Sequence, residues 1–219
     1  METFRAFSPE AIRYLSDLKK NNTREWFAAN KASYEAHLKE PGKQFAAHLA
    51  RRLGALTGHS HDSKIFRINR DIRFSKDKTP YNAHLHIALI PVGRAGQPPM
   101  WFFGVSSEKL SLGCGVFQYP KDTLTDFRAA MAGPMGSDLI SLSAELCEKG
   151  IRIGEPELKR VPPGFEKDHP NGEALRRKGF AAWIDKDDPA FVTKADLVDR
   201  TIAEFETLLP VYHLLSQVL

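Results

Sequence analysis

The chain has 219 residues, of which 31 are lysine or arginine and 27 are aspartate or glutamate, for a formal net charge of +4. Hydrophobic residues make up 42% and charged residues 26%, which is typical of a soluble globular protein and argues against disorder. The N-terminus lacks the basic and apolar regions of a signal peptide, and no apolar run reaches the roughly 18 residues that span a bilayer. We therefore expect a cytoplasmic protein with no membrane partner, folded as a single domain over residues 1–219.

Helices are expected in the N-terminal quarter, where apolar residues recur at helical spacing. The first covers residues 9–19. Asn22 is then expected to cap a second helix, with Glu25 three residues on as its capping-box partner. This second helix should end before Pro41, because the residue before a proline disfavours helical backbone. A third helix is expected over about 42–56.

The middle of the chain changes to segments rich in β-branched and aromatic residues, a composition that favours β-strands. The connections between these segments are short. They favour antiparallel hairpins, because parallel strands need crossovers of a dozen or more residues. The expected strands cover residues 64–74, 84–90, 100–107 and 110–117.

Helical spacing returns in the last part of the chain. Helices are expected over 124–131 and 137–148, near 173–178, and over 195–219 with a kink at Pro210. Strands grouped in the middle with helices at both ends predict an α+β fold. Its central antiparallel sheet should hold strands within about 64–117, flanked by the N-terminal and C-terminal helices.

The net charge is concentrated in one stretch, KIFRINRDIRFSKDK, the cationic segment (residues 64–78). It holds six basic and two acidic residues, which leaves 25 basic and 25 acidic groups on the other 204 residues. Treated as a strand, the segment places Arg70 on an otherwise apolar face, together with Phe66, Ile68 and Phe74. A buried, unpaired arginine costs several kcal/mol, so Arg70 predicts a carboxylate partner or an anionic ligand.

The segment continues into a loop rich in serine, aspartate and threonine, whose side chains bond readily to nearby backbone. Its hydroxyls, backbone N–H groups and lysines can converge on an anion, and arginine forks suit phosphate or carboxylate. In the alternative interpretation, the arginines pair internally with Asp71 and Asp77. The candidate ligand-binding residues are Arg67, Asn69, Arg70, Arg73, Ser75, Lys76 and Lys78, with Asn30 and Lys31 from the second helix.

His84 and His86 stand two residues apart and so share one side of the next strand. Two such histidines can share a metal, but a site needs a third or fourth ligand, and residues 59–62 (HSHD) have only loop spacing. We therefore assign no metal and no cofactor. His84 is the main candidate for acid–base chemistry, and Tyr81 and Asp71 complete the catalytic candidates.

Several stretches together are similar to one family. NNTREWFAANKASYE, RINRDIRFSKDKTPYNAHL, SLGCGVF and GFEKDHPNGEALRRKGF resemble domain of unknown function 2461, an uncharacterised bacterial and fungal family, over nearly the whole chain. The resemblance implies a single-domain α+β protein and no particular function. Asn82-Ala83 stands where the family commonly has Lys-Thr, and Gly104 stands where its third strand often carries a histidine. The second departure weakens a shared histidine-based metal site or mechanism.

Three functions are compatible with these features. In the leading hypothesis, a cationic pocket binds a small phosphorylated or carboxylated molecule, with enzymatic activity left open. In the second, the same segment binds nucleic acid or a nucleotide through salt-sensitive contacts, although the neutral remainder offers no extended basic surface. In the third, the segment is an ion-paired scaffold in a structural or partner-binding protein. The oligomeric state is not predicted.

Overall fold

The computed structural model describes residues 4–94 and 96–218. None of the helices in these ranges combines the length and the apolar character needed to cross a membrane. The elements, in chain order, are α1 (Pro9–Lys20), α2 (Arg24–Ala29), α3 (Lys31–Tyr34), η1 (Glu35–Lys39), α4 (Glu40–Thr57), β1 (His61–Ile65), β2 (His84–Pro91), β3 (Met100–Ser106), β4 (Leu110–Val116), α5 (Lys121–Ala132), α6 (Pro134–Glu148), β5 (Arg152–Ile153), α7 (Gly172–Leu175), β6 (Phe180–Lys186), η2 (Pro189–Thr193), α8 (Leu197–Glu206) and α9 (Leu209–Leu215).

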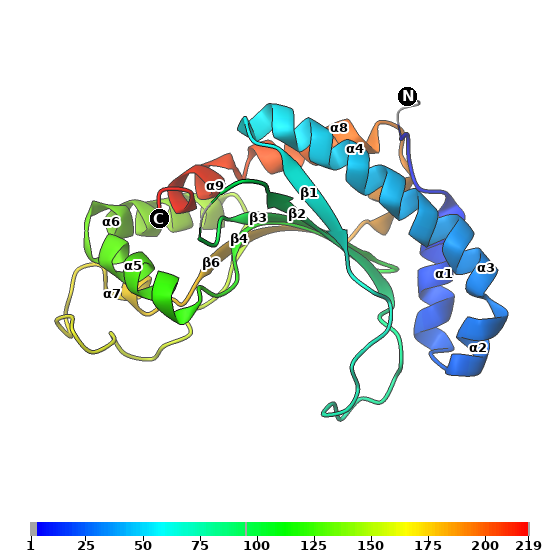
Figure 1. Ribbon diagram of the computed structural model, residues 1–219, viewed down its shortest axis with the longest axis horizontal. Helices are drawn as coiled ribbons and strands as arrows, with labels where there is room; N and C mark the ends of the chain where they lie inside the picture. Colours follow the sequence, from blue (N-terminus) through cyan, green and yellow to red (C-terminus); the bar gives the residue numbers. More distant parts are fainter. Residues whose placement is uncertain (1–3, 95, 219) are drawn as a thin grey trace. The chain divides into compact units, whose positions relative to one another are not determined.

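The strands form one antiparallel sheet with the order β1-β2-β3-β4-β6-β5, which confirms the α+β class (Figure 1). The three strands predicted over 84–117 are present, as β2, β3 and β4. The sheet is wider than predicted, because β6 and β5 come from the C-terminal half. Arg152 of β5 pairs with Trp183 of β6 in antiparallel register.

The described chain divides into two compact units that share these strands. The first unit comprises the described residues up to Leu89, together with Phe102–Leu112 and Asp185–Ala203. The second comprises Ile90–Trp101, Gly113–Ile184 and the described residues from Glu204 onward. Because of this division, a single domain over the whole chain stays a prediction.

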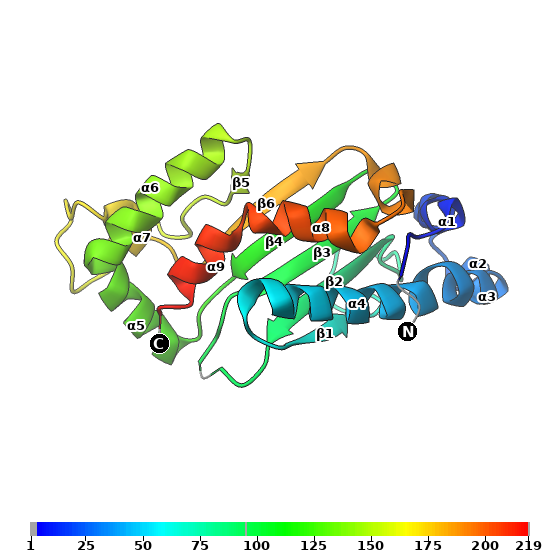
Figure 2. The ribbon, with the colours of Figure 1, turned by 90° about the horizontal axis from the view of Figure 1, so that it is seen from above.

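The core of the first unit lies between its helices and one face of its strands. Figure 2 shows α4 and α8 running across the sheet. Phe45 of α4 is fully buried, and its ring centroid lies 4.7 Å from that of Phe103 in β3 and 5.5 Å from that of Phe4. Side chains alternate along a strand, so residues next to the buried ones, such as His86 and Ser111, project from the opposite face.

The second unit has an aromatic core of its own. The Trp101 ring lies 4.9 Å from that of Phe205 and 5.4 Å from that of Tyr212, and all three side chains are buried. On β4, Gly113 lies directly beneath Trp183, since a Cβ at this position would come within 2.5 Å of the indole. Glycine therefore allows the close approach of a large ring to the sheet.

The chain remains helical through Pro41, and the prediction of a helix end there is wrong. Residues 35–39 form a π-helical turn, in which the Glu40 N–H donates to the Glu35 carbonyl oxygen. This wider turn joins α3 to α4 and places Pro41 in the first turn of α4, where its missing N–H costs little. The helix ends at Gly58, whose φ of 75° is the left-handed conformation that glycine favours.

Two other helix ends differ from the prediction. Thr23, not Asn22, caps α2: its Oγ1 accepts a hydrogen bond from the Trp26 N–H at 3.2 Å. The last helix does not bend at Pro210 but breaks before it, between α8 and α9, and Pro210 lies in the first turn of α9. Proline is tolerated in a first turn, so a new helix starts where the old one cannot continue.

Candidate functional site

The cationic segment lies mostly in the long connection between β1 and β2. The strand ends at Ile65, and residues 66–83, the β1–β2 loop, leave the sheet and return to it at β2 (Figure 1). Pairing along the loop is irregular: the Arg70 N–H donates to the Pro80 carbonyl oxygen at 2.9 Å, and an isolated bridge joins Asn69 to Tyr81.

The prediction of a strand over 64–74 is therefore wrong, and so is its apolar face, since Phe66 is 46% and Phe74 95% exposed. Side-chain bonds to the loop's own backbone replace the regular ladder. Asp77 accepts from the Thr79 N–H at 2.9 Å, and Lys78 donates to the Ile72 carbonyl oxygen at 3.0 Å.

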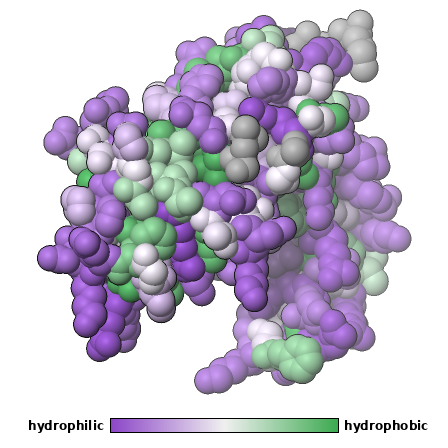
Figure 3. Space-filling view, turned by 60° about the vertical axis from the view of Figure 1, so that its left-hand side comes forward, coloured by the Kyte–Doolittle hydropathy of each residue, from purple (hydrophilic) through white to green (hydrophobic). Residues whose placement is uncertain are grey.

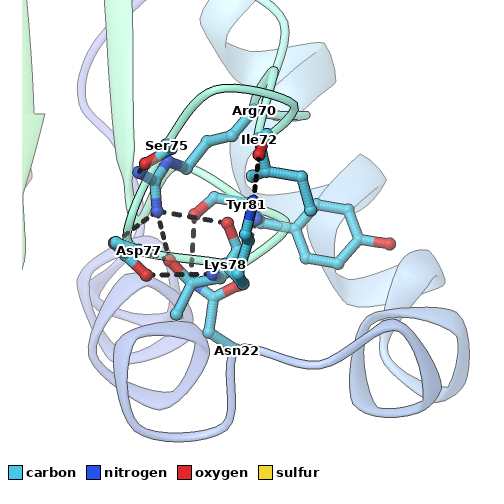
Figure 4. A network of polar contacts seen from close by, with 8 residues as sticks. Asn22, Arg70, Ile72, Ser75, Asp77, Lys78 and Tyr81 are labelled. Carbon is cyan, nitrogen blue, oxygen red and sulfur yellow. Dashed lines mark hydrogen bonds and ion pairs between the residues drawn. The ribbon is translucent and has the colours of Figure 1, made fainter.

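Arg70 is the centre of the hydrogen bonds inside the loop, and Figure 4 shows its guanidinium turned toward Ser75 and Asp77. Its Nη1 donates to Asp77 Oδ2 at 2.5 Å, to the Thr79 carbonyl oxygen at 3.1 Å, and also to Thr79 Oγ1. Its Nη2 lies 3.4 Å from Ser75 Oγ. The carboxylate partner of Arg70 is thus Asp77.

Asp77 is held as a carboxylate by its neighbours. Hydrogen bonds from the Thr79 N–H, from the Arg70 guanidinium and from the Thr79 hydroxyl lower the pKa of Asp77 to about 2. The hydroxyl bond measures 3.0 Å. The loop therefore contains a small network in which one guanidinium, one carboxylate and one threonine satisfy each other.

Arg73 and Asp71 form a second, exposed ion pair. Arg73 Nε donates to Asp71 Oδ1 at 3.0 Å and Nη2 donates to Oδ2 at 2.7 Å, the bidentate geometry that favours arginine–carboxylate pairs. The guanidinium lowers the pKa of Asp71. A carboxylate stabilised in this way is poorly suited to donate a proton, the task of a catalytic acid.

Four cations of the segment are left after these two pairs. All four are exposed, and in the described part of the chain no carboxylate lies within 4 Å of any of them. Lys78 donates to a carbonyl oxygen, which does not cancel its charge. The local excess of four therefore survives folding, and it is carried by Lys64, Arg67, Lys76 and Lys78.

The β1–β2 loop is fastened to the N-terminal helices by Asn22. Its Oδ1 accepts from the Tyr81 N–H at 3.0 Å and its Nδ2 donates to the Tyr81 carbonyl oxygen at 2.9 Å (Figure 4). The Tyr81 ring, 8% exposed, stacks on Phe27 at 4.1 Å between centroids. Tyr81 thus packs the end of the β1–β2 loop against the N-terminal helices. No local pattern indicates this pairing, because Asn22 and Tyr81 are far apart in the chain.

Asn30 and Lys31, two further predicted binding residues, lie away from this network. The Asn30 side chain donates to the Trp26 carbonyl oxygen at 2.8 Å and so ends α2. Lys31 is exposed at the start of α3. Among the described residues, no hydrogen bond or ion pair joins either side chain to the cationic segment.

His84 and His86 stack on each other at the foot of the β1–β2 loop, with ring centroids 3.7 Å apart and planes at 19°. Desolvation of the ring, followed by the charge of Arg70, lowers the pKa of His84. Desolvation and the neighbouring His84 lower the pKa of His86 to about 4, although part of the residue reaches solvent. Both imidazoles are therefore neutral at pH 7.

The neighbouring strands explain the room that His86 occupies. A Cβ on Gly104 would lie 2.8 Å from His86 Cδ2, so the absence of a side chain on β3 lets the imidazole cross the strand. Further along the same face, Ser111 Oγ donates to Asp185 Oδ1 at 2.6 Å, and Lys109 Nζ lies 3.1 Å from Asp185 Oδ2. Sequence reasoning missed Lys109 and Asp185, which meet only through the pairing of β4 with β6.

The histidines do not form part of a recognisable metal centre. Within residues 4–94 and 96–218, no three histidine, cysteine, aspartate or glutamate side chains are close enough to hold a metal ion. His61, one of the candidates in the 59–62 stretch, is buried in β1, and burial lowers its pKa.

Comparison with known proteins identifies a family and adds no reaction. No curated protein matches the chain. A family model described as "Conserved hypothetical protein (DUF2461)" matches residues 10–214. That range contains the cationic segment, the histidine pair and the sheet. Because the match covers nearly the whole chain, the protein belongs to this family of conserved hypothetical proteins.

Proposed function

We propose that the protein binds a small phosphorylated or carboxylated molecule through the cationic segment. The observation that supports this proposal is the charge that survives internal pairing. Arg70 and Arg73 are bonded to Asp77 and Asp71, yet four exposed cations remain on one stretch of an otherwise neutral chain. Charge-assisted hydrogen bonds from such groups are the usual means of holding phosphate and carboxylate oxygens.

Internal hydrogen bonds hold the loop that carries these cations. The hydrogen bonds of Arg70 hold the backbone between Ser75 and Thr79. The two hydrogen bonds between the Asn22 side chain and the Tyr81 backbone, the Asn22 clasp, hold it at Tyr81. Cations carried on a braced loop lose less freedom on binding than cations on a mobile one, which favours affinity. In this proposal Arg67, Lys76 and Lys78 contact the ligand, and Arg70 holds the loop that presents them.

If the bound molecule is transformed, His84 is the proposed proton-transfer group. Its ring is neutral near pH 7 and lies close enough to Arg70 to feel that charge, so it can accept a proton beside a bound anion. An anion near His84 would favour the protonated imidazole. Ligand binding should then take up a proton, and affinity should rise as the pH falls toward the pKa of His84.

A thermal-shift screen with inorganic phosphate, sugar phosphates, nucleotides and organic acids, followed by calorimetry of the hits, tests the proposal. The double variant Arg67→Ala/Lys76→Ala should weaken binding of a hit at least tenfold without lowering the melting temperature. The matched control Arg24→Ala/Lys20→Ala removes the same charge from exposed positions near α1 and α2. Equal loss of affinity in both variants, or in neither, would contradict a site at the cationic segment.

A second candidate function is binding of single-stranded nucleic acid by the same loop. Few large hydrophobic side chains are exposed in the described chain, and the face shown in Figure 3 is mostly hydrophilic. Phe74 is nevertheless 95% exposed, and in the chain it lies between Arg73 and Lys76. The Arg73 guanidinium lies 6.0 Å from the centroid of its ring. Exposed aromatic rings beside cations are the elements on which bases stack. Oligonucleotide anisotropy with Phe74→Ala would test this, and no binding at low salt would eliminate it.

A further inference from the structure

We propose that a cavity in the second unit is a separate binding site for a small molecule that carries two or more phosphoryl groups. The cavity has a volume of about 620 Å³, within the range of small-molecule sites, and it is lined by residues between Lys159 and Arg176. This stretch overlaps the sequence GFEKDHPNGEALRR (residues 164–177), to which the proposed function assigns no role.

Four cations line this cavity, namely Lys159, Arg160, Lys167 and Arg176. In the described chain, no carboxylate lies within 4 Å of any of them. Glu173 also lines the cavity, but its Oε1 lies 3.0 Å from Arg177 Nη2, so that carboxylate is already paired. Like charges gathered without a counter-charge repel one another, and a bound polyanion would relieve this repulsion.

The backbone that carries these cations is fixed. The Leu158 N–H donates to the Arg176 carbonyl oxygen at 3.0 Å, which brings the two ends of the stretch together. Asn171, 5% exposed, donates through Nδ2 to the Met131 and Gly133 carbonyl oxygens at 3.1 and 2.8 Å. These bonds attach the stretch to the turn between α5 and α6, so its backbone is held at both ends and at Asn171.

His169 adds a neutral donor to the lining. Its Nδ1 accepts a hydrogen bond from the Asn171 N–H at 3.0 Å. The neutral ring must then carry its proton on Nε2, the only ring nitrogen left for a ligand. An imidazole in this tautomer can donate but not accept, which suits a ligand whose oxygens only accept hydrogen bonds.

The lining residues also indicate the class of ligand. Val161 and Pro170 are the apolar side chains among them, and no phenylalanine, tyrosine or tryptophan of the described chain lines the cavity, so a base would find only the small His169 ring to stack on. A single phosphate, with a charge of roughly −1.5 to −2 at pH 7, would leave about half of the four cations unmatched. Two or more phosphoryl groups match the charge and use the space.

Calorimetry of the full chain with inorganic pyrophosphate, and with inorganic phosphate for comparison, tests this site. The variant Lys159→Ala/Lys167→Ala should weaken pyrophosphate binding at least tenfold and abolish the rise in melting temperature that pyrophosphate causes. The control Lys121→Ala/Lys149→Ala removes two exposed lysines of the same unit outside the cavity, and it should bind as the wild type does.

Three results would overturn the proposal. One is a Lys159→Ala/Lys167→Ala variant that binds pyrophosphate like the wild type. Another is phosphate binding as tight as pyrophosphate binding, which would contradict a preference for ligands with two or more phosphoryl groups. The third is loss of pyrophosphate binding in Arg67→Ala/Lys76→Ala instead, which would move the ligand to the cationic segment and leave the proposed function standing.

Discussion

The Arg70 guanidinium bonds to residues five, seven and nine positions further along the chain, so it closes the β1–β2 loop on itself. Its side chain is only 24% exposed, whereas that of Arg73 is 77% exposed. Arginines three residues apart in one segment therefore differ in what they do. Arg70 is tied into the fold, Arg73 is paired at the surface, and Arg67 has no carboxylate within 4 Å among the described residues.

This difference predicts unequal effects on stability. Arg70→Ala should lower the free energy of unfolding by about 1–2 kcal/mol, because it removes several hydrogen bonds and leaves Asp77 without its counter-charge. Arg67→Ala, at an exposed position three residues earlier, should change it by less than about 0.5 kcal/mol. Urea unfolding measures both values. Equal effects of the two substitutions would contradict the bracing role of Arg70.

The pKa of Asp77 gives a second check at this scale. Its folded pKa lies below the unfolded one, so its contribution to stability is present above about pH 4 and is lost as the pH falls through about 2. In Arg70→Ala the pKa should rise but stay below its usual value, because the Thr79 N–H, the largest cause, still donates. A carbon-detected NMR titration of the carboxyl group measures this shift. An identical pKa in both proteins would refute the Arg70–Asp77 pair.

The stacked histidines make a prediction of the same kind. Both folded pKa values lie below the unfolded value of 6.5, so their contribution to stability is present above pH 6.5 and is lost as the pH falls through the folded values, which for His86 is about 4. Gly104→Ala should push the His86 ring off its stack and move its pKa back toward 6.5. Imidazole NMR signals would report these titrations. An unshifted His86 in the wild type would contradict the desolvated stack.

At the scale of elements, the sequence was informative where one local pattern sufficed. Helices α1 and α4 and strands β2 to β4 each follow from the spacing of apolar residues that are close together in the chain. These predictions are confirmed. The strand over 64–74 failed for a physical reason. Charged and apolar residues alternate in this stretch as they do in a strand. Hydrogen bonds between side chains and backbone within the loop, however, compete with the backbone pairing of a regular sheet.

The candidate sites were predictable only in part. The cationic segment was found because its charge is contiguous in sequence. The cavity of the second unit was missed because residues 157–178 mix six basic with four acidic residues, and only folding brings four of the cations to one wall. Asn22 was predicted as a cap, since nothing local showed that its amide would meet the Tyr81 backbone.

The Asn22 clasp joins two elements and is testable by substitution. Asn22→Ala removes two hydrogen bonds to the loop base and should cost about 1–2 kcal/mol of unfolding free energy. Asn22→Asp can still accept from the Tyr81 N–H but cannot donate to its carbonyl oxygen, so it should cost less near neutral pH. Asn21→Ala, which loses only a bond to the preceding helix, is the control. Chemical denaturation that ranks Asn21→Ala as the most damaging would contradict the clasp.

At the scale of the whole molecule, a net charge of +4 conceals how the charge is distributed. One local excess lies on the cationic segment and persists after its ion pairs form, while a second cluster of cations arises only in the folded second unit. In both proposals it is this local charge, and not the net charge, that attracts the anion. The proposed functions therefore depend on positions, and charge-matched variants are the appropriate controls.

The most direct test of ligand binding by the cationic segment is an amide NMR titration of the full chain with inorganic phosphate at low ionic strength. The proposal predicts that amide shifts will change within residues 66–84 and that these changes will be lost in Arg67→Ala/Lys76→Ala but kept in Arg24→Ala/Lys20→Ala. Saturable shifts confined to other parts of the chain, with residues 66–84 unmoved, would contradict it.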